Sequence, residues 1–260
     1  MEVGILYFLI VIFSNALGSL SGMGGGIIIK PIFDLVSVHT IVEITFYSSV
    51  AVFTMAVVSV WRQLSNGLKI DLKVAIATSI GAFFGGVIGN VILNQLIFVI
   101  KNPDLVLLIQ IVLTIITLII SSLYIKYQWR QYQITSVFWY LMTGVLLGVL
   151  GSLLGIGGGP INVTLLIFMF AIPVKEATVY SIIIILVSQF SKLTSVFFTT
   201  GFQEFDLNIL YFIIPAAIGG GFLGARLSNI FSSEKVSKVF QYTIGLIIAL
   251  NIYNGIQIFI

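Results

Sequence analysis

Hydrophobic residues gather in ten runs along the chain, and the short connections between the runs carry most of the charged residues. The longer runs reach about 20 residues, the length that an α-helix needs to cross a membrane. They lack the alternation of apolar and polar positions that marks the strands of a membrane β-barrel. The pattern therefore predicts an all-α integral membrane protein, with runs at about residues 3–21, 26–38, 41–60, 72–100, 105–125, 135–154, 159–172, 177–199, 207–230 and 237–259.

Two glycine-rich stretches interrupt this pattern. The first glycine break spans residues 22–26 (Gly-Met-Gly-Gly-Gly), and the second glycine break spans residues 155–159 (Gly-Ile-Gly-Gly-Gly). Glycine costs a helix about 1 kcal/mol per position relative to alanine, so each stretch should separate two helices. Within a membrane, such irregular backbone must be buried in protein or line a water-filled cavity. Two breaks at corresponding points of two halves indicate a transporter site near the middle of the bilayer.

The second half of the chain repeats the first. When the two glycine breaks are superposed, Glu43, Thr45, Tyr47 and Ser48 fall on Glu176, Thr178, Tyr180 and Ser181; we call this alignment the repeat register. Further along, a slightly longer offset superposes Asp71 on Asp206. Glycines recur by chance in membrane helices, but an acid and three polar residues in one register indicate duplication. We therefore predict two membrane repeats, residues 1–130 and 131–260.

The topology depends on the two short runs, residues 26–38 and 159–172. If both cross the membrane, the chain has ten segments and inverted halves whose broken helices meet near the midplane; if both re-enter, it has eight spans and parallel halves. Ten segments place only Lys101 on one side and nine basic residues on the other, whereas eight spans divide the basic residues equally. The positive-inside rule favours ten segments with both termini on the non-cytoplasmic side. The nine residues are Arg62, Lys69, Lys73, Lys126, Arg130, Lys175, Arg226, Lys235 and Lys238.

Composition agrees with a membrane protein and excludes several kinds of site. The chain is 59% hydrophobic and 8% charged, whereas soluble proteins carry about 25% charged residues. It has no cysteine and one histidine, His39, which argues against disulfides, thiol chemistry and a bound metal, and we expect no cofactor. The net charge of +3 belongs to the loops of a membrane protein and does not indicate nucleic-acid binding.

The doubled motif resembles the TauE/SafE sulfite exporter family, also called the toluene sulfonate uptake permease family. The resemblance covers nearly the whole chain. It rests on Gly-x-Gly-Gly-Gly twice, on the Glu-x-Thr-x-Tyr-Ser stretches that begin at Glu43 and Glu176, and on Gly-Gly-x-x-Gly-Ala-Arg ending at Arg226. It implies an exporter of small sulfur-containing anions, such as sulfite or organosulfonates, in the plasma (inner) membrane. The halves differ, because Lys30-Pro31 stands where the second half has Val163-Thr164.

The glycine breaks are the first candidates for binding an anion, because peptide N–H groups at a helix start are donors and the helix dipole favours negative charge. Glycine also lets a ligand approach the backbone closely, and Pro160 suits a first helical turn. The alternative role of these glycines is close helix packing. Asn162 and Thr164 could add side-chain donors, or could bond a neighbouring helix. The candidate substrate-binding residues are Gly24, Gly25, Gly26, Gly157, Gly158, Gly159, Asn162 and Thr164.

Two lysines complete the candidate substrate site. Lys30 and Lys192 lie within apolar runs, where an ionisable side chain indicates function by default; the alternative for Lys192 is snorkelling to the membrane surface. Arg226 is interpreted as an anchor in an inside-facing loop. Glu43 and Glu176 begin the helices after the short runs, either as acids that favour a helix N-terminus or as gating or proton-relay groups.

These features predict a secondary transporter that works by alternating access. A coupling proton or other ion is expected, and the oligomeric state is left open. The chain carries no Walker motif, so it has no nucleotide site of its own to drive transport. An anion channel would need a continuous polar pore, a membrane enzyme would need a nucleophile–base set or a metal cluster, and a non-transporting membrane subunit would need no central site.

Overall fold

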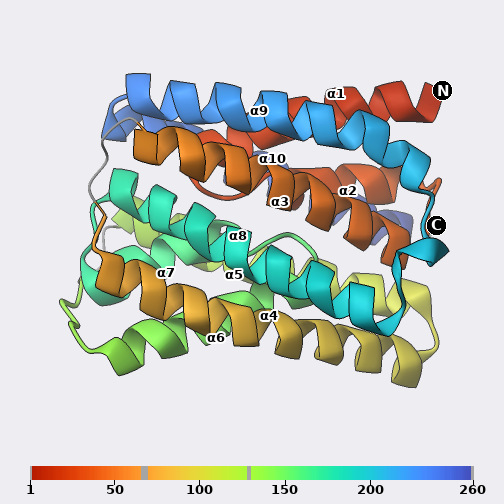
Figure 1. Cartoon of the computed structure of the whole chain (residues 1–260), viewed down its shortest axis with the longest axis horizontal. Helices are drawn as coiled ribbons and strands as arrows, with labels where there is room; N and C mark the ends of the chain where they lie inside the picture. Colours follow the sequence, from red (N-terminus) through yellow and green to blue (C-terminus); the bar gives the residue numbers. More distant parts are fainter. Residues whose placement is uncertain (1, 66–69, 128–129, 259–260) are drawn as a thin grey trace.

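The computed structural model describes residues 2–65, 70–127 and 130–258. These residues form ten α-helices and two short 3₁₀ turns, and no strand occurs among them (Figure 1). The all-α prediction is confirmed. The helices are α1 Glu2–Ser21, α2 Gly26–Val36, α3 Ile41–Ser65, α4 Leu72–Ile100, α5 Pro103–Tyr127, α6 Val137–Leu153, α7 Pro160–Phe170, α8 Val174–Thr199, α9 Leu210–Ile230 and α10 Ser233–Gln257, and the 3₁₀ turns are η1 Phe202–Glu204 and η2 Leu207–Ile209.

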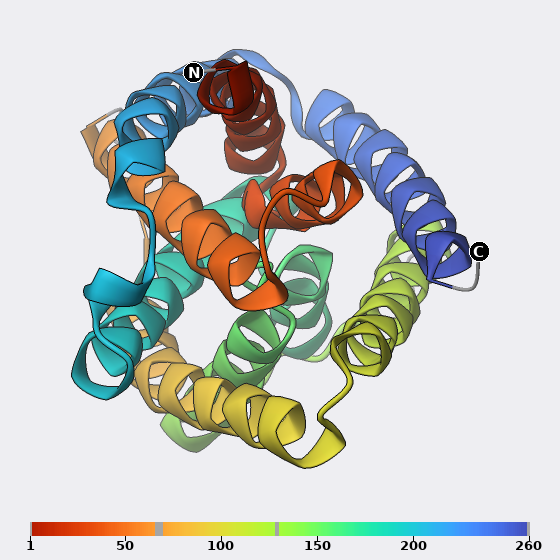
Figure 2. The ribbon, with the colours of Figure 1, turned by 90° about the vertical axis from the view of Figure 1, so that its right-hand side faces the viewer.

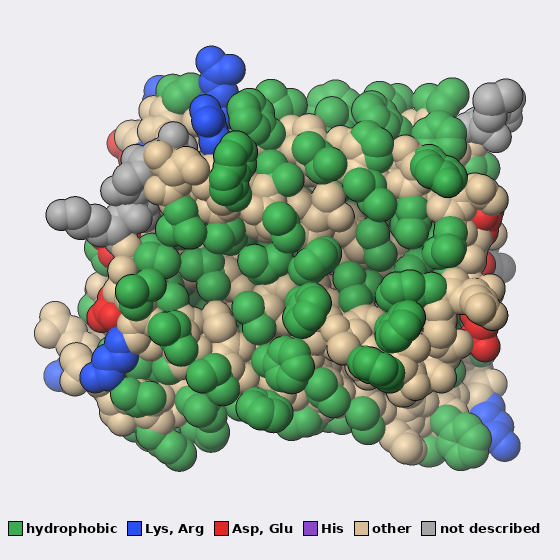
Figure 3. All heavy atoms as spheres, in the orientation of Figure 1, with side chains coloured by type: hydrophobic (Ala, Val, Ile, Leu, Met, Phe, Trp, Pro, Cys, Tyr) green, Lys and Arg blue, Asp and Glu red, His purple; other side chains and the backbone are tan. Residues whose placement is uncertain are grey.

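The surface is that of a membrane protein. Within the described ranges, seven helices are long and apolar enough to cross a membrane, namely α1, α3, α4, α5, α8, α9 and α10. Helices α6 and α7 are shorter apolar helices. Apolar side chains cover the middle of the face seen in Figure 3, and basic and acidic side chains lie toward its two ends. This distribution fits an apolar band in lipid between two charged ends in water.

Helices of the two halves pack against one another in equivalent pairs. The most extensive contacts are those of α4 with α6 and of α1 with α9, followed by α3 with α9 and α4 with α8. In the predicted repeat, α1 corresponds to α6, α3 to α8 and α4 to α9. The pair α4–α6 then corresponds to α9–α1, and the pair α4–α8 corresponds to α9–α3. Helices α3 and α8, which correspond to each other in the predicted repeat, also pack together.

Glycine brings the most closely packed helices together. A Cβ atom on Gly220 would lie 2.6 Å from the carbonyl oxygen of Ile12, so α9 touches the backbone of α1. Gly85 and Gly144 make backbone contacts of the same kind between α4 and α6. Glycines inside these helices therefore have the packing role of small residues.

Both termini lie at one end of the bundle, at the right in Figure 1 and facing the viewer in Figure 2; we call this the terminal end. The C-terminal ends of α3 and α5 lie at the opposite end.

Tyr47 donates a hydrogen bond to the carbonyl of Asp206 over 3.2 Å, and the hydroxyl of Tyr180 accepts one from the N–H of Asp71 over 2.5 Å. These two contacts involve residues that occupy equivalent positions in the two halves.

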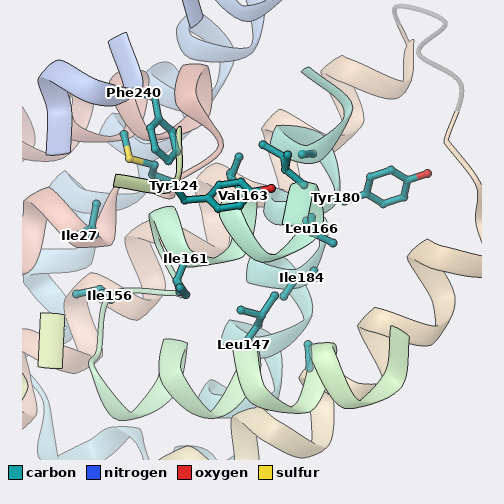
Figure 4. Close-up of a cluster of buried hydrophobic side chains, with 14 of the residues drawn as sticks. Ile27, Tyr124, Leu147, Ile156, Ile161, Val163, Leu166, Tyr180, Ile184 and Phe240 are labelled. Atoms are coloured by element: carbon teal, nitrogen blue, oxygen red, sulfur yellow. The ribbon is translucent and has the colours of Figure 1, made fainter. Parts of the chain in front are cut away.

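The core fills the space around the short helices. Helix α7 is apolar and buried, which suits a helix surrounded by protein. In Figure 4, Ile161, Val163 and Leu166 of α7 lie among side chains from α6 and α8, and Tyr180 points out of this cluster. A second cluster joins α1, α2, α3 and α9. The two short helices are therefore held in place by long helices from both halves.

Candidate functional site

Both glycine breaks separate helices, as the sequence predicts. Helix α1 ends at Ser21 before α2, and α6 ends at Leu153 before α7. Six glycines of the two breaks have positive φ, from +63° to +112°. Only glycine adopts this backbone conformation at low cost. They are Gly22, Gly24, Gly155, Gly157, Gly158 and Gly159. Gly25 has φ −68° and caps α2, and Gly26 is the first helical residue, so α2 begins one residue earlier than the glycine pattern predicts.

The two breaks meet between α3 and α8. A Cβ atom on Gly24 would lie 3.1 Å from Ile185 and 3.7 Å from Val52, and one on Gly157 would lie 3.4 Å and 3.0 Å from the same two side chains. A Cβ atom on Gly26 would lie 2.7 Å from the carbonyl oxygen of Ile156. The first break therefore touches the second, at the middle of the two long helices that lie beside both.

Each break is hydrogen-bonded to the other half of the chain. The hydroxyl of Ser181 donates to the carbonyl of Gly22 over 2.5 Å, and the hydroxyl of Ser48 donates to the carbonyl of Gly155 over 3.4 Å. The repeat register superposes the two serines on each other, and likewise the two glycines. The residues of the duplicated motif thus contact one another across the halves.

Buried side-chain amides without partners lie beside the second break. Gln189 and Asn162 are both 0% exposed, and in the described part of the chain neither their nitrogen nor their oxygen atoms have a hydrogen-bond partner. The Nε2 atom of Gln189 lies 3.7 Å from where a Cβ on Gly157 would sit, and the Asn162 amide lies against Gly158 in the same way. The buried hydroxyl of Thr164 also lacks a partner among these residues. Such groups cost about 1–3 kcal/mol each when unsatisfied, so each of them calls for a hydrogen-bonding partner such as a water or a polar ligand.

Lys192 is buried and not neutralised. Its side chain is 1% exposed, which rules out snorkelling to the surface. Its Nζ atom donates to the carbonyl of Ser152 over 3.3 Å, and no described carboxylate lies within ion-pair distance. Lys30 differs, because it pairs with Asp34 over 3.0 Å. Among the described residues, the basic side chain beside the breaks that no carboxylate pairs with is therefore Lys192.

A narrow cleft extends from the terminal end toward Lys192, which is one of its lining residues. It lies between α3, α4 and α8, and its mouth is formed by the start of α3 and the end of α8. The polar residues that line it are Thr45, Ser49, Asn90, Asn94, Thr199 and Thr200. Thr45 is buried, and its hydroxyl has no partner among the described residues. The cleft gives Lys192 a partly polar route to one side of the protein.

The two candidate acids lie away from the breaks. Glu43 accepts a hydrogen bond from the N–H of Thr40 over 2.8 Å, and the hydroxyl of Thr40 accepts one from the N–H of Glu43 over 3.3 Å; this is a capping box. Nine residues separate Glu43 from Val52, about 14 Å along a helix. Glu176 also lies in a first helical turn, that of α8, but the N-cap there is Pro173 and no side-chain capping bond forms. The geometry fits helix-start acids, and gating by either acid stays a prediction.

Comparison with known proteins identifies the family. The family model described as Sulfite exporter TauE/SafE matches residues 7–252. The chain belongs to this family. It is also 32% identical over 111 residues to the Probable membrane transporter protein YunE of Bacillus subtilis (strain 168), a match that covers 42% of this chain and 39% of that protein. No solved structure matches. The family is one of membrane transporters and not of enzymes, so the resemblance found in the sequence is confirmed.

Sequence reasoning missed Gln189 as a member of the candidate site in this TauE/SafE protein. Gln189 lies three residues before Lys192 in α8, so a helix places both on one face. It also missed Val52 and Ile185, which pack against both breaks. The available signal was their position, because the repeat register superposes Val52 on Ile185.

Proposed function

We propose that the chain is a secondary transporter that exports a small sulfur-containing anion, such as sulfite or an organosulfonate, across the plasma membrane. The observation that carries this proposal is the meeting of two glycine breaks beside a buried lysine that no described carboxylate neutralises. Family membership supports the class of protein and of substrate.

The site supplies the donors that an anion requires. The helix starts offer few free peptide N–H groups, because α7 begins at Pro160, which has none, and the N–H groups of Ile28 and Asn162 bond the carbonyls of Gly25 and Gly159. The two helix dipoles still favour negative charge there. Asn162 and Gln189 add neutral amide N–H groups, and Lys192 adds a full positive charge. In a dry interior these groups bind an anion far more strongly than they would in water, because few solvent dipoles screen the interaction.

The proposal includes two inverted repeats, residues 1–130 and 131–260, in ten membrane segments. The equivalent helix pairs and the exchanged serine bonds support the repeats. Inverted repeats allow one half to rock against the other around a fixed central site, which exposes the site to each side in turn. In this account the cleft to Lys192 belongs to the state that is open at the terminal end.

The orientation follows from charge. Of the basic residues assigned to the cytoplasmic side, Arg62 and Lys126 lie at the ends of α3 and α5, opposite the terminal end; Lys69 lies outside the described residues. Lys101, the single basic residue assigned to the other side, ends α4. Both termini are therefore placed on the non-cytoplasmic side.

A binding screen tests the proposed function. Purified protein is heated with sulfite, sulfate, thiosulfate and several organosulfonates, and its unfolding temperature is recorded. A ligand that binds the folded state stabilises it by RT ln(1 + [L]/Kd), so the transported anion should raise this temperature. The variant Lys192→Met should lose most of the rise and Lys192→Arg should keep part of it. An equal rise in Lys192→Met, or none with any sulfur anion in the wild type, would overturn the proposal.

A further inference from the structure

Helix α2 carries a buried ion pair that the anion site does not require. Lys30 Nζ and Asp34 Oδ2 are 3.0 Å apart, and the two side chains are 5% and 6% exposed. The other ion pairs among the described residues are more exposed, at 13% and 26% for His39–Glu43 and at 64% and 77% for Lys238–Glu234. The free energy needed to remove two charges from water can exceed the free energy that their attraction returns. A buried ion pair is therefore poorly explained by stability alone.

The pair leaves one carboxylate oxygen of Asp34 without a partner. The Oδ1 atom of Asp34 is buried and has no hydrogen-bond donor within the described ranges. The same is true of Oδ1 of Asn254, which is 5% exposed. The orientation of the Asn254 amide is fixed, because its Nδ2 donates to the carbonyl of Pro31 over 2.8 Å. Both orphan atoms are acceptors, so neither can satisfy the other, and each calls for a hydrogen-bond donor or a cation.

These two residues line one polar pocket at the terminal end. The pocket lies between the end of α2, the start of α5 and the end of α10. Asp104 from α5 and Gln257 from α10 line it as well, so its polar side chains include carboxylates and amides. Oxygen ligands of this kind suit hard cations.

The charge balance selects a monovalent cation. The pocket holds the carboxylates of Asp34 and Asp104, and Lys30 cancels one of these two negative charges. One negative charge remains, which a single positive ion neutralises. Tight binding of a divalent ion would favour a cluster of several charged ligands. Across the described residues, no group of three or more His, Cys, Asp or Glu side chains is placed to hold a metal ion.

We propose that this pocket binds Na⁺ through Asp34, Asn254 and Asp104, and that the bound ion shares the Asp34 carboxylate with Lys30 by taking its free oxygen Oδ1. Sharing Asp34 leaves more of the Lys30 charge to act at the anion site, because the Lys30 Cδ atom lies 3.4 Å from where a Cβ on Gly155 would sit. Helix α2 joins the pocket to the first glycine break. This coupling rests on the proposed anion transport, whereas Na⁺ binding itself does not.

Binding of radioactive ²²Na⁺ to the purified, anion-free protein tests the site. We expect saturable binding that excess Na⁺ displaces and that equal K⁺ or choline does not. Asp34→Asn should weaken it at least tenfold, and Asp104→Asn should weaken it several-fold. Asp104 is exposed, so its variant answers the question even if Asp34→Asn does not fold. Glu204→Gln, which removes an exposed acid elsewhere, should bind ²²Na⁺ as the wild type does.

Two results would overturn the sodium site. One is no displaceable ²²Na⁺, which would leave a bound water as the partner of the two orphan oxygens. The other is equal ²²Na⁺ binding by the wild type and Asp34→Asn.

The coupling is tested separately, by measuring sulfur-anion affinity with Na⁺ and with choline at equal ionic strength. This affinity should rise at least fivefold in Na⁺. An affinity that is the same in Na⁺ and choline, even if it changes with pH, would contradict the coupling. Failure of all anion binding with ²²Na⁺ binding intact would refute the proposed function alone.

Discussion

At the scale of the residue, the site is marked by buried polar groups that the protein does not satisfy. Gln189 is the sharpest case. Replacing it by methionine keeps the shape and removes two unsatisfied polar atoms, so Gln189→Met should unfold at the wild-type temperature or above it. The same change removes a donor to the anion, and anion affinity should fall about tenfold, equivalent to roughly 1.4 kcal/mol. Thermal unfolding and direct binding on one preparation measure both.

Gln110 provides the matched control. It is 2% exposed, and its Nε2 donates to the carbonyl of Leu153 over 2.8 Å, whereas its Oε1 has no partner among the described residues. Gln110→Met breaks that bond and should cost about 1 kcal/mol of stability, while anion affinity stays normal in the folded protein. The opposite pattern in the two variants, with Gln189→Met unstable and Gln110→Met weak in binding, would place Gln189 in the structural framework instead.

At the scale of the element, each glycine break separates two consecutive helices, α1 from α2 and α6 from α7. Gly24 and Gly157 have φ of +75° and +81° and face the same side chains, Val52 and Ile185. Alanine at either position should cost about 1–2 kcal/mol of stability through its backbone conformation and should also weaken anion binding. Because the two positions share one site, the double variant should lose less affinity than the sum of the single losses, by about 0.5 kcal/mol or more.

The variant Gly201→Ala separates the effect of backbone strain on stability from the effect of a substitution on anion binding. The φ of Gly201 is +75°, and a Cβ there would meet nothing within 4 Å. Gly201→Ala should therefore show a comparable loss of stability with unchanged anion affinity. Normal affinity in both Gly24→Ala and Gly157→Ala, measured on the folded fraction, would assign the glycine breaks to packing alone.

Hydrophobic periodicity predicts the elements well and the site only in part. Each of the ten runs becomes a helix, and the largest error is α3, which reaches Ser65 because a helix continues into polar sequence such as Arg62 and Gln63. The glycine breaks were predictable, since glycine acts on its own backbone. Gln189 and the Asp34–Asn254 pocket were not, because unsatisfied burial depends on neighbours that lie far away in the sequence.

At the scale of the whole molecule, the inverted ten-segment arrangement puts Gln133 in the cytoplasm and Glu204 outside. Both are exposed in connections at opposite ends of the bundle, and the chain has no cysteine of its own. An impermeant thiol reagent added to intact cells should label Glu204→Cys at once and Gln133→Cys only after permeabilisation. Labelling of Gln133→Cys from outside would contradict the orientation.

Anion flux through reconstituted vesicles tests the central claim most directly. Protein is inserted into liposomes loaded with sulfite, and the efflux rate is followed as the sulfite concentration rises. A transporter with one central site should show a rate that saturates, and Gln189→Met and Lys192→Met should raise the half-saturating concentration by the factor that each loses in binding. A rate that grows linearly with concentration would indicate a channel, and vesicles no more permeable to any sulfur anion than protein-free ones would contradict the account.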